Sequence, residues 1–475
     1  MPSDKVAVIA IDDESIANIG RWPWPRDIHA HMHEILTEGG ARVIGQTVLF
    51  TEPHIDPGLQ FITELKTAFE GSAIATVPGN IVDLEKIINR SHDKLKTKHD
   101  ANGRRAIKQI SKYLANSPLK TDVAEEIVNY IDFLAAAELA LDTDLKLVES
   151  MALTNNVVLA MTFSSGTQRG RPDEDLPDYL LTNKLPQQNI INNAITNPKG
   201  LAPISMVDAL APIPAAGEAA AGIGALVSIL DVDGGLRSEP LLVNYYGDFY
   251  PSMALLLAAK SLNLAVDDIK ATFGNSVSLG RLHIKTDGQS LMNTFFYSND
   301  QAGKQAFPVD SFYDVLQGKV PASKFNNKLV LIGATAIGVG DSMVTPIDPS
   351  MPPVIILAHS VSSILNEDFF IQPAWGLVAT LSAFALVALH LMLALPRMGA
   401  AAGFTVTALL FIAFFTSEYI LMTRYGMWVK LMLPNMLLLG GYLLLTTKHF
   451  LMTERGKARL DIESAETNRM LGLSM

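Results

Sequence analysis

Hydrophobic and polar positions at the start of the chain follow a strand period, then a helix period, then a strand period again. Residues 6–11 (VAVIAI) are continuously apolar, which is typical of a strand buried on both faces. From about Arg26 to the glycine pair at 39–40, apolar residues recur at helical spacing, at Ile28, Met32, Ile35 and Leu36. Residues 41–50 (ARVIGQTVLF) are again strand-like. This order predicts a βαβ unit.

The pattern changes between residues 57 and 150, where amphipathic segments predict a helical insertion. Strand-like runs return afterwards, and residues 224–247 predict a hairpin with its turn at Asp231 to Gly235. Residues 354–369 predict a helix that runs straight into the first membrane segment. The predicted fold class is therefore α/β, with a mixed, largely parallel sheet in residues 1–372.

Three long apolar stretches follow, at residues 373–395, 399–422 and 425–447. Each is long enough to cross a hydrocarbon core of roughly 30 Å as a helix, so residues 373–447 predict three transmembrane helices. Gly399 and Gly403 favour close helix packing, and we expect a homodimer or higher homo-oligomer through this bundle. Residues 448–475 are expected to form a cytoplasmic linker helix.

The basic residues around these stretches predict the orientation. Three crossings put the two ends on opposite sides, and the tail after Thr447 has the larger excess of lysine and arginine. The positive-inside rule therefore places the tail in the cytoplasm and residues 1–372 outside. A domain of this size needs an export signal, and residues 1–11 have none. We expect a membrane helix before Met1 rather than an inverted topology.

Composition narrows the class of function. The 475 residues carry a formal net charge of −11, which disfavours nucleic-acid binding because that requires a basic surface. The chain has no cysteine, so disulfides, thiolate catalysis and Cys-ligated zinc are excluded. A mean hydropathy of +0.24 agrees with the lipid bilayer as a partner.

Three acidic residues, Asp12, Asp13 and Glu14, follow the first predicted strand. In that position they could cap a helix, hold a ligand or a hard cation such as Mg²⁺ or Ca²⁺, or act in acid–base catalysis. No nucleophile, partner base or phosphate loop accompanies them, so we expect no catalytic residue in this chain. Because parallel strands end at one edge, we expect Asp12 and Asp13 to lie near two other acids that follow strands, Glu52 and Asp341.

Other motifs predict neither a metal nor a cofactor. His29 and His33 share a helix face, but no third zinc ligand is evident. The turn DVDGG is similar to part of a calcium loop, yet Leu236 and Leu242 stand where that loop needs a glycine and an acid. Residues 333–341 (GATAIGVGD) lack the Lys-Ser/Thr ending of a phosphate loop.

A stiff aromatic segment, Trp22-Pro23-Trp24-Pro25, precedes Arg26. Each proline restricts the residue before it to extended conformations. Two interpretations stay open: the tryptophans form a hydrophobic plug over the sheet edge, or they form a wall of a ligand or dimer surface together with Arg26.

Five segments in order resemble the type-two CHASE domain, the extracytoplasmic sensor of bacterial membrane receptors: IAIDDESIANIGRWPWPRDIHAHMHEI, VLFTEP, LDVDGGLRSEPLLVNYYGDFYPSMAL, PVDSFYDVLQGKV and KLVLIGATAIGVGDSMVTP. The resemblance covers nearly all of the chain outside residues 57–150. It implies a place in the bacterial inner membrane, a membrane helix before the sensor, and a cytoplasmic output domain that this chain lacks. The tail resembles the linker of the branch with a Ser/Thr kinase; a nucleotide cyclase such as adenylate cyclase is the runner-up.

The resemblance also bears on an unknown extracytoplasmic ligand or protein partner. His359 matches the family helix, whereas Leu357 replaces a histidine, Ile355 a glutamate, and Thr47 an acidic residue. The candidate ligand residues are Asp12, Asp13, Glu14, Trp22, Trp24, Arg26, Glu52, Asp341 and His359. The alternative function is a membrane-anchored structural or assembly protein that oligomerises and binds no small ligand.

Two charged residues lie within the apolar stretches, Glu418 in the second and Lys430 in the third. Ionised groups cost about 2.5–3.5 kcal/mol near the bilayer centre. Either each side chain reaches water separately, or the two form an ion pair, with Arg424 as a third member, that fixes the register of the hairpin.

Overall fold

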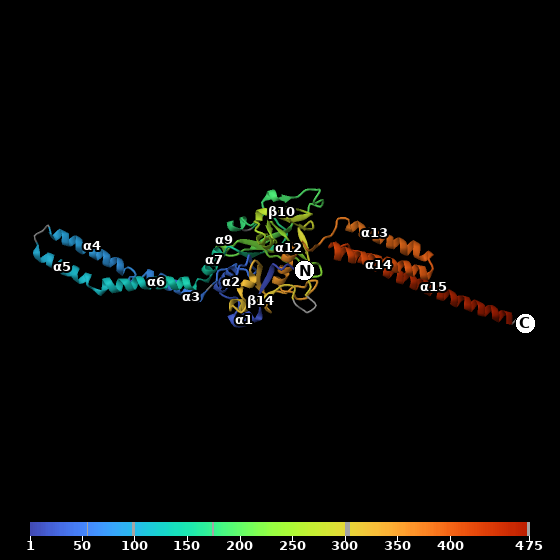
Figure 1. Cartoon of the computed structure of the whole chain (residues 1–475), viewed down its shortest axis with the longest axis horizontal. Helices are drawn as coiled ribbons and strands as arrows, with labels where there is room; N and C mark the ends of the chain where they lie inside the picture. The colour runs from blue at the N-terminus through green and yellow to red at the C-terminus, as the bar shows by residue number, and fades with distance from the viewer. Residues whose placement is uncertain (55, 97–99, 173–174, 300–304, 473–475) are drawn as a thin grey trace.

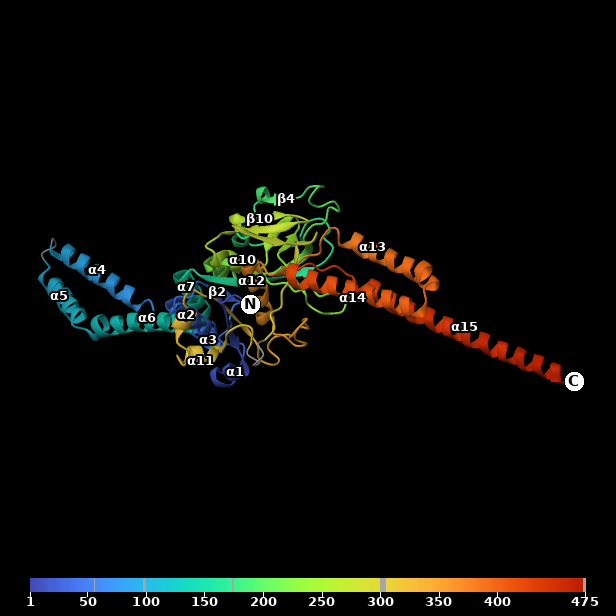
Figure 2. The ribbon, with the colours of Figure 1, turned by 45° about the vertical axis from the view of Figure 1, so that its right-hand side comes forward.

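The computed structural model describes residues 1–54, 56–96, 100–172, 175–299 and 305–472. A central α/β domain carries a helical arm on one side and a bundle of three long helices on the other (Figure 1). The arm and the bundle stay at opposite ends of the domain when the molecule is turned (Figure 2). The predicted fold class is confirmed, because a mixed α/β domain is followed by three long apolar helices.

The main sheet has a parallel part and an edge of mixed strand direction. The parallel part runs in the order β14 (Val309–Ser311), β1 (Val6–Ile11), β15 (Leu329–Ala334), β2 (Val43–Gln46) and β3 (Val157–Ser165), with β6 (Gly222–Ala225) also parallel to β3. The edge consists of β5 (Ile204–Leu210), β8 (Leu242–Tyr245) and β9 (Asp248–Pro251). The predicted βαβ unit is present, but β15 from the far end of the domain lies between its two strands.

Two smaller sheets complete the domain. One contains β12 (Leu282–Lys285), β11 (Ser276–Leu279), β10 (Ile269–Thr272) and β4 (Ile190–Ile191), and the other contains β16 (Phe369–Phe370), β13 (Leu291–Thr294) and β7 (Ser238–Pro240). The hairpin predicted at residues 224–247 is wrong as a ladder. Its two arms pair elsewhere, in β6 and β7, and are joined to each other by an isolated bridge between Ile229 and Ser238 and by hydrogen bonds within the turn.

Helices cover both faces of the main sheet, and β1 shows the division. Val6 and Val8 pack on one side with α10 (Met253–Ser261) and α12 (Pro353–Asn366), which we call the α12 face. Ala7, Ile9 and Ile11 pack on the other side, the α2 face, with α2 (Arg26–Glu38), α7 (Thr143–Thr154), α9 (Pro214–Ala219) and α11 (Phe312–Leu316). Alternation along the strand thus separates two cores.

Local sequence explains the turn between β1 and α2. Asp12 caps the short helix α1 (Asp13–Ile19), because its carboxylate accepts a hydrogen bond from the backbone N–H of Ser15 at 2.9 Å. Gly20 ends the helix with a φ of 130°, a conformation that favours glycine. The capping role that the sequence allowed for Asp12 is confirmed.

The helical arm is built from α3 (Pro57–Glu70), α4 (Val77–Lys96), α5 (Ala101–Ala115) and α6 (Ala124–Leu141). These helices bury few side chains; α3 buries none and α5 only Leu114. By contrast, α7 lies on the domain, where Leu147 and Met151 pack in the core of the α2 face. The remaining short helices are the π-helical turn Leu119–Val123 between α5 and α6, α8 (Asp178–Leu181) and the 3₁₀ turns Gln187–Asn189, Val266–Asp268 and Ala322–Phe325.

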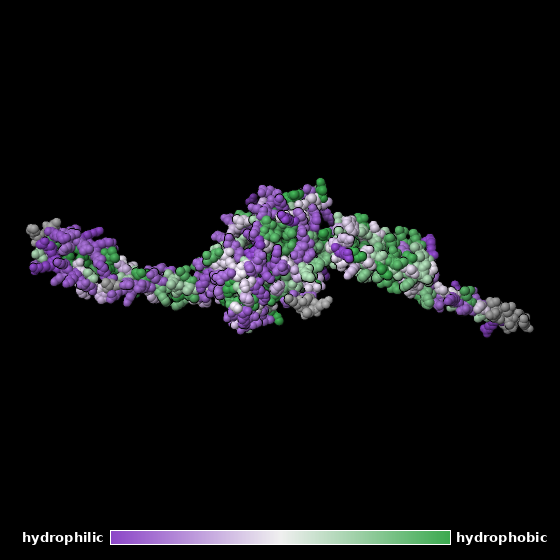
Figure 3. All heavy atoms as spheres, viewed as in Figure 1, coloured by the Kyte–Doolittle hydropathy of each residue, from purple (hydrophilic) through white to green (hydrophobic). Residues whose placement is uncertain are grey.

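The bundle contains α13 (Gly376–Leu389), which continues as helical turns to Arg397, α14 (Ala400–Tyr425) and α15 (Met432–Gly472). Three helices in the described residues are long and apolar enough to cross a membrane. Figure 3 shows the apolar surface of the bundle, and the more polar end of α15 beyond it. The domain and the end of α15 lie at opposite ends of the bundle (Figure 1).

The connection between the domain and the bundle differs from the prediction. The helix α12 does not continue into α13, because Glu367 adopts a left-handed conformation with a φ of 55°. The chain then forms β16, which pairs with β13, and Ile371 bonds to the turn between α14 and α15. A strand therefore joins the domain to the bundle.

Candidate functional site

A cavity of about 360 Å³ opens beside α12 and is within the range of small-molecule sites. His359, which the family resemblance singled out, lines it. Its other described lining residues are Ser298, Asn299, Gln305, Ala306, Phe307, Val309, Thr335, Ile347, Asp348, Met351, Pro352 and Ile355. Hydroxyl, amide and carboxylate groups converge on an otherwise apolar wall, an arrangement that suits a small hydrogen-bonding molecule.

His359 is 1% exposed and held in one orientation. Its Nδ1 accepts a hydrogen bond from the backbone N–H of Tyr297 at 3.1 Å, so the neutral ring carries its proton on Nε2. Burial lowers the pKa of His359 to about 4, and the ring is therefore neutral near pH 7. The Tyr297 ring stacks on it with centroids 5.8 Å apart and an interplanar angle of 13°.

Tyr297 links His359 to the connection with the bundle. Its hydroxyl donates to the Asp368 carboxylate at 2.9 Å. Asp368 directly precedes β16, and Ile371 directly follows it. Ile371 donates its N–H to the carbonyl of Gly426 at 2.7 Å and accepts from the N–H of Trp428 at 2.9 Å. The cavity wall is thus connected, contact by contact, to the turn between α14 and α15.

A half-buried carboxylate that sequence reasoning missed lies on the same face. Glu239 of β7 accepts a hydrogen bond from the Ser360 hydroxyl of α12 at 3.1 Å. Burial raises the pKa of Glu239 to about 7, although bonds from Ser360 and Ser252 oppose the shift. Glu239 could not be singled out from the sequence, because its partners lie on α12 and at the start of α10.

The acids predicted to share a sheet edge have separate local partners. Asp12 accepts from the hydroxyls of Ser15 and Ser311 at 2.5 and 2.9 Å, and Asp13 accepts from the N–H of Ile337 at 3.3 Å. Glu14 lies 3.9 Å from Lys319. In the described part of the chain, no group of three or more histidine, aspartate or glutamate side chains could hold a metal ion.

Arg26 ties three segments together. Its Nε donates to Asp144 of α7 at 3.2 Å, its Nη2 donates to the carbonyl of Glu52 at 2.8 Å, and its guanidinium lies 4.4 Å from the centroid of Phe50. The carboxylate of Glu52 and that of Asp341 are both exposed. Arg26 is therefore a structural strut between α2, α7 and the segment after β2.

Trp24 is buried, as expected of a hydrophobic plug over the sheet edge. It is 2% exposed, donates through Nε1 to the Gly20 carbonyl at 2.9 Å, and lies 5.0 Å from Phe312. Trp22 is half-buried beside it, and the Trp22–Pro23 peptide bond is cis. The structure favours the plug interpretation for Trp24.

His29 and His33 lie in a buried polar cluster with Gln46 of β2. The amide of Gln46 lies 3.2 Å from Nδ1 of His29 and 3.4 Å from Nε2 of His33. Burial lowers the pKa of His29 to about 3 and that of His33 to about 4, so both rings are neutral. The sequence showed the histidines on one helix face but not that a strand residue separates them.

An arginine that follows the turn DVDGG pairs with the two aspartates of the turn. Arg237 bonds to Asp231 and to Asp233, each at 2.7 Å, and these contacts hold the pKa of Asp233 well below its usual range. Arg237 therefore balances one of the two negative charges of the turn.

The charged membrane residues are not brought together. The ammonium of Lys430 lies 5.4 Å from the centroid of Trp428, and the Glu418 carboxylate faces the backbone N–H of Met432. Arg424 is exposed at the end of α14. Within the residues that the structure describes, no ion pair joins Glu418 to Lys430 or Arg424.

A comparison with protein families matches residues 1–398 to the model of the CHASE2 domain. The match includes the α/β domain, the arm and α13. No curated protein and no solved structure matches the chain.

Proposed function

Because the chain belongs to the CHASE2 domain family of extracellular sensors, we propose that it is the sensory and transmembrane region of a bacterial signal-transduction receptor. In this proposal the α/β domain and the arm lie outside the inner membrane and the end of α15 lies in the cytoplasm. The output domain that receives the signal is a Ser/Thr kinase, with a nucleotide cyclase as the alternative.

One observation carries the proposal: the continuous path of contacts from the cavity to the bundle. A ligand that bonds to His359 would shift the ring on which Tyr297 stacks. Tyr297 holds Asp368 at the start of β16, and β16 leads to Ile371 and its two hydrogen bonds with the α14–α15 turn. A ligand can shift the receptor only by binding its two states differently, and this path gives the cavity and the bundle shared contacts.

A reversible disulfide tests the relay. The chain has no cysteine, so Ile371→Cys with Met427→Cys introduces a single pair at positions that form a bridge. In a receptor carrying its output domain, oxidation should clamp the connection and abolish the response to stimulus, and reduction should restore it. Each single cysteine variant is the matched control. An unchanged response in the oxidised double variant would refute the relay.

Cysteine labelling in intact cells tests the orientation. Val232→Cys in an exposed turn of the domain should react with a membrane-impermeant maleimide, whereas Ser464→Cys on α15 should react only after permeabilisation. The reverse pattern would contradict the proposed topology.

A second function, assembly through the arm, is favoured by one observation. The arm exposes large apolar side chains, including Phe61, Tyr113 and Phe133. These residues suit contact with another protein or another copy of the chain. Light scattering of the Phe61→Ser/Phe133→Ser variant tests it, because loss of a larger species would favour assembly and an unchanged mass would argue against it.

A further inference from the structure

We infer that the junction between the domain and the bundle binds a membrane phospholipid through its phosphate group. The site is a cavity of about 610 Å³ adjoining a second cavity of about 360 Å³. Both are lined by Arg237, Asn293, Phe370 and Trp428. This inference rests on the membrane crossing and goes beyond the proposed relay.

The location of the larger cavity fits the membrane surface. Phe370, Ile371 and Gln372, which line it, precede α13, and Trp428 and Lys430 precede α15. Tryptophan and lysine at the ends of membrane helices commonly lie at the level of the lipid headgroups. The cavity is therefore open to the headgroup layer rather than to bulk water alone.

The two cavities differ in chemistry as the two parts of a phospholipid do. The larger one is lined by charged residues, namely Asp231, Asp233, Arg237, Lys285, Asp287 and Lys430. The smaller one is mainly apolar and is lined by Phe295, Phe296, Pro346, Ile347 and Met422 in addition to the shared residues. A headgroup in the first cavity would place its glycerol and the start of an acyl chain in the second.

Two lysines of the larger cavity are the groups that could bind a phosphate. Arg237 is already paired with both aspartates of its turn, and Asp287 accepts the backbone N–H groups of Gln289 and Leu291. Lys285 donates a hydrogen bond to the amide oxygen of Asn275, and Lys430 lies over the ring of Trp428. Neither lysine has a carboxylate partner among the described residues, so two ammonium groups are left for an anion.

Two buried hydroxyl groups also point to a ligand. Thr286 lines the larger cavity and Thr294 the smaller one, and the Oγ1 atoms of both have no hydrogen-bond partner among the described residues; Thr294 is only 3% exposed. Unpartnered buried hydroxyls are costly. The phosphate and ester oxygens of a phospholipid would supply acceptors for both.

Titration of the full chain in mild detergent with a short-chain phosphatidylglycerol tests the inference, with native mass spectrometry and thermal unfolding as readouts. The wild type should retain one phospholipid and be stabilised by it. Replacing either lysine, Lys285→Gln or Lys430→Gln, should weaken binding about tenfold, because each removes a bond to a charged group. The exposed lysines are not required for packing, so these variants should fold.

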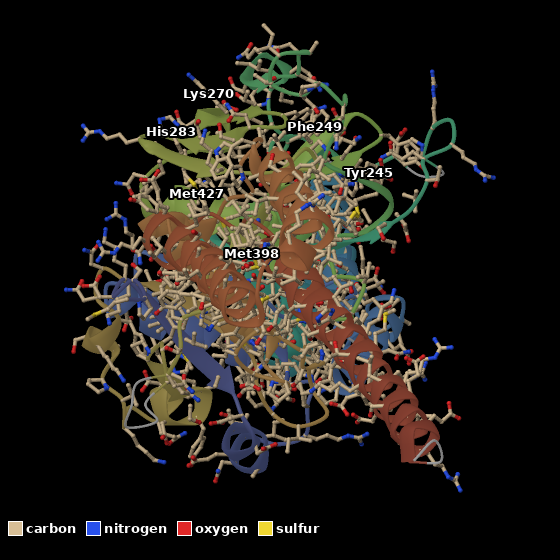
Figure 4. All side chains as sticks on the ribbon, turned by 90° about the vertical axis from the view of Figure 1, so that its right-hand side faces the viewer. Tyr245, Phe249, Lys270, His283, Met398 and Met427 are labelled. Carbon is tan, nitrogen blue, oxygen red and sulfur yellow. The ribbon has the colours of Figure 1, made fainter. Side chains whose placement is uncertain are left out.

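Lys270→Gln is the matched control, because Lys270 is exposed on β10 and lies apart from Met427 of the α14–α15 turn (Figure 4). It should bind as the wild type does. Met422→Trp, which fills the apolar cavity, should weaken phospholipid binding as well.

Three results would overturn the inference. These are undiminished binding in the Lys285→Gln/Lys430→Gln variant, equal stabilisation by a diacylglycerol that has no phosphate, and equal stabilisation by inorganic phosphate alone. The last result would identify a free phosphate site instead of a lipid site.

Discussion

The two faces of the main sheet bury histidines in different ways. On the α2 face, His29 and His33 contact Gln46 in a closed core beside Trp24 and Phe312. On the α12 face, His359 bonds to a backbone N–H and lines a cavity. All three rings are neutral, and His359 lines a cavity that a ligand could fill.

This difference implies that the histidines of the α2 face act in stability, whereas His359 acts in signalling. A polar cluster whose partners are all side chains of the core specifies how α2 is placed on the sheet. A polar side chain that lines a cavity, and whose neighbour leads to the membrane connection, can change its partners when a ligand binds. Substitutions on the α2 face should therefore act mainly on folding, and those around His359 mainly on the response.

The largest expected effect on the unfolding free energy comes from lowering the pH. The folded pKa values of His29, His33 and His359 are about 3, 4 and 4, below the ordinary 6.5, so the unfolded chain binds more protons as pH falls below 6.5. Each histidine should then remove about 1.4 kcal/mol of unfolding free energy per pH unit. Glu239 changes the unfolding free energy in the opposite direction, because its raised pKa favours the folded state at low pH. Its contribution offsets about that of one histidine.

Thermal unfolding of the full chain in mild detergent at pH 5 and pH 7.5, followed by tryptophan fluorescence, measures this effect. We expect a much lower Tm at pH 5. The variant His31→Gln, which changes an exposed histidine, is the control. Equal Tm values at both pH values would show that the buried histidines do not titrate with unfolding.

The second effect is the loss of the shared partner on the α2 face. Gln46→Leu leaves both His29 and His33 without the amide that they contact, and each unsatisfied buried group costs about 1–3 kcal/mol. We expect a fall of about 2–6 kcal/mol in unfolding free energy, measured by chemical denaturation. Gln168→Leu removes bonds near the sheet edge and is the matched control. A similar loss in both variants would contradict a special role for the cluster.

A smaller effect of opposite sign is expected from Glu239→Gln on the α12 face. At pH 8 the glutamate is ionised in a half-buried position, so an uncharged amide should raise the unfolding free energy by about 1 kcal/mol. At pH 5 the folded glutamate is already protonated and the gain should vanish. Exposed Glu38→Gln is the control, and a gain of equal size at both pH values would argue against titration of Glu239.

The smallest effect on stability, with the largest on function, is expected from His359→Phe. The N–H of Tyr297 loses its acceptor, which costs about 1 kcal/mol, while the response to stimulus should be lost. His33→Phe on the α2 face is the matched control and should lower Tm while the response is kept. A normal response in the His359→Phe receptor would remove this residue from the relay.

Local patterns predicted much of the fold. The apolar run of β1, the Asp12 cap and three helices long and apolar enough to cross a membrane depend on neighbouring residues, and each was confirmed. The insertion of β15 between β1 and β2 depends on residues nearly 300 positions away. The prediction that a helix continues into the membrane was wrong. Residues 369–370 form a strand because they pair with β13, and no pattern in the neighbouring residues indicates that pairing.

The site shows the same limit. His359 and Arg26 were singled out from the sequence, but the contacts of Arg26 with Asp144 and Glu52 give it a structural role. Glu239 and Gln46 were missed because their partners lie on other elements. A polar residue inside an otherwise apolar strand, as at Gln46, was the only signal that the sequence offered.

The attachment of Ile371 to the α14–α15 turn has a mechanical consequence. The domain is joined to α13 by the chain itself and to α14 and α15 by the two hydrogen bonds with Gly426 and Trp428. A bundle attached to the domain at one point could rotate in any direction. Attachment at two points limits the bundle to rotation about the axis through those points. A movement of the domain would therefore tilt all three helices of the bundle together and would not rotate α13 alone.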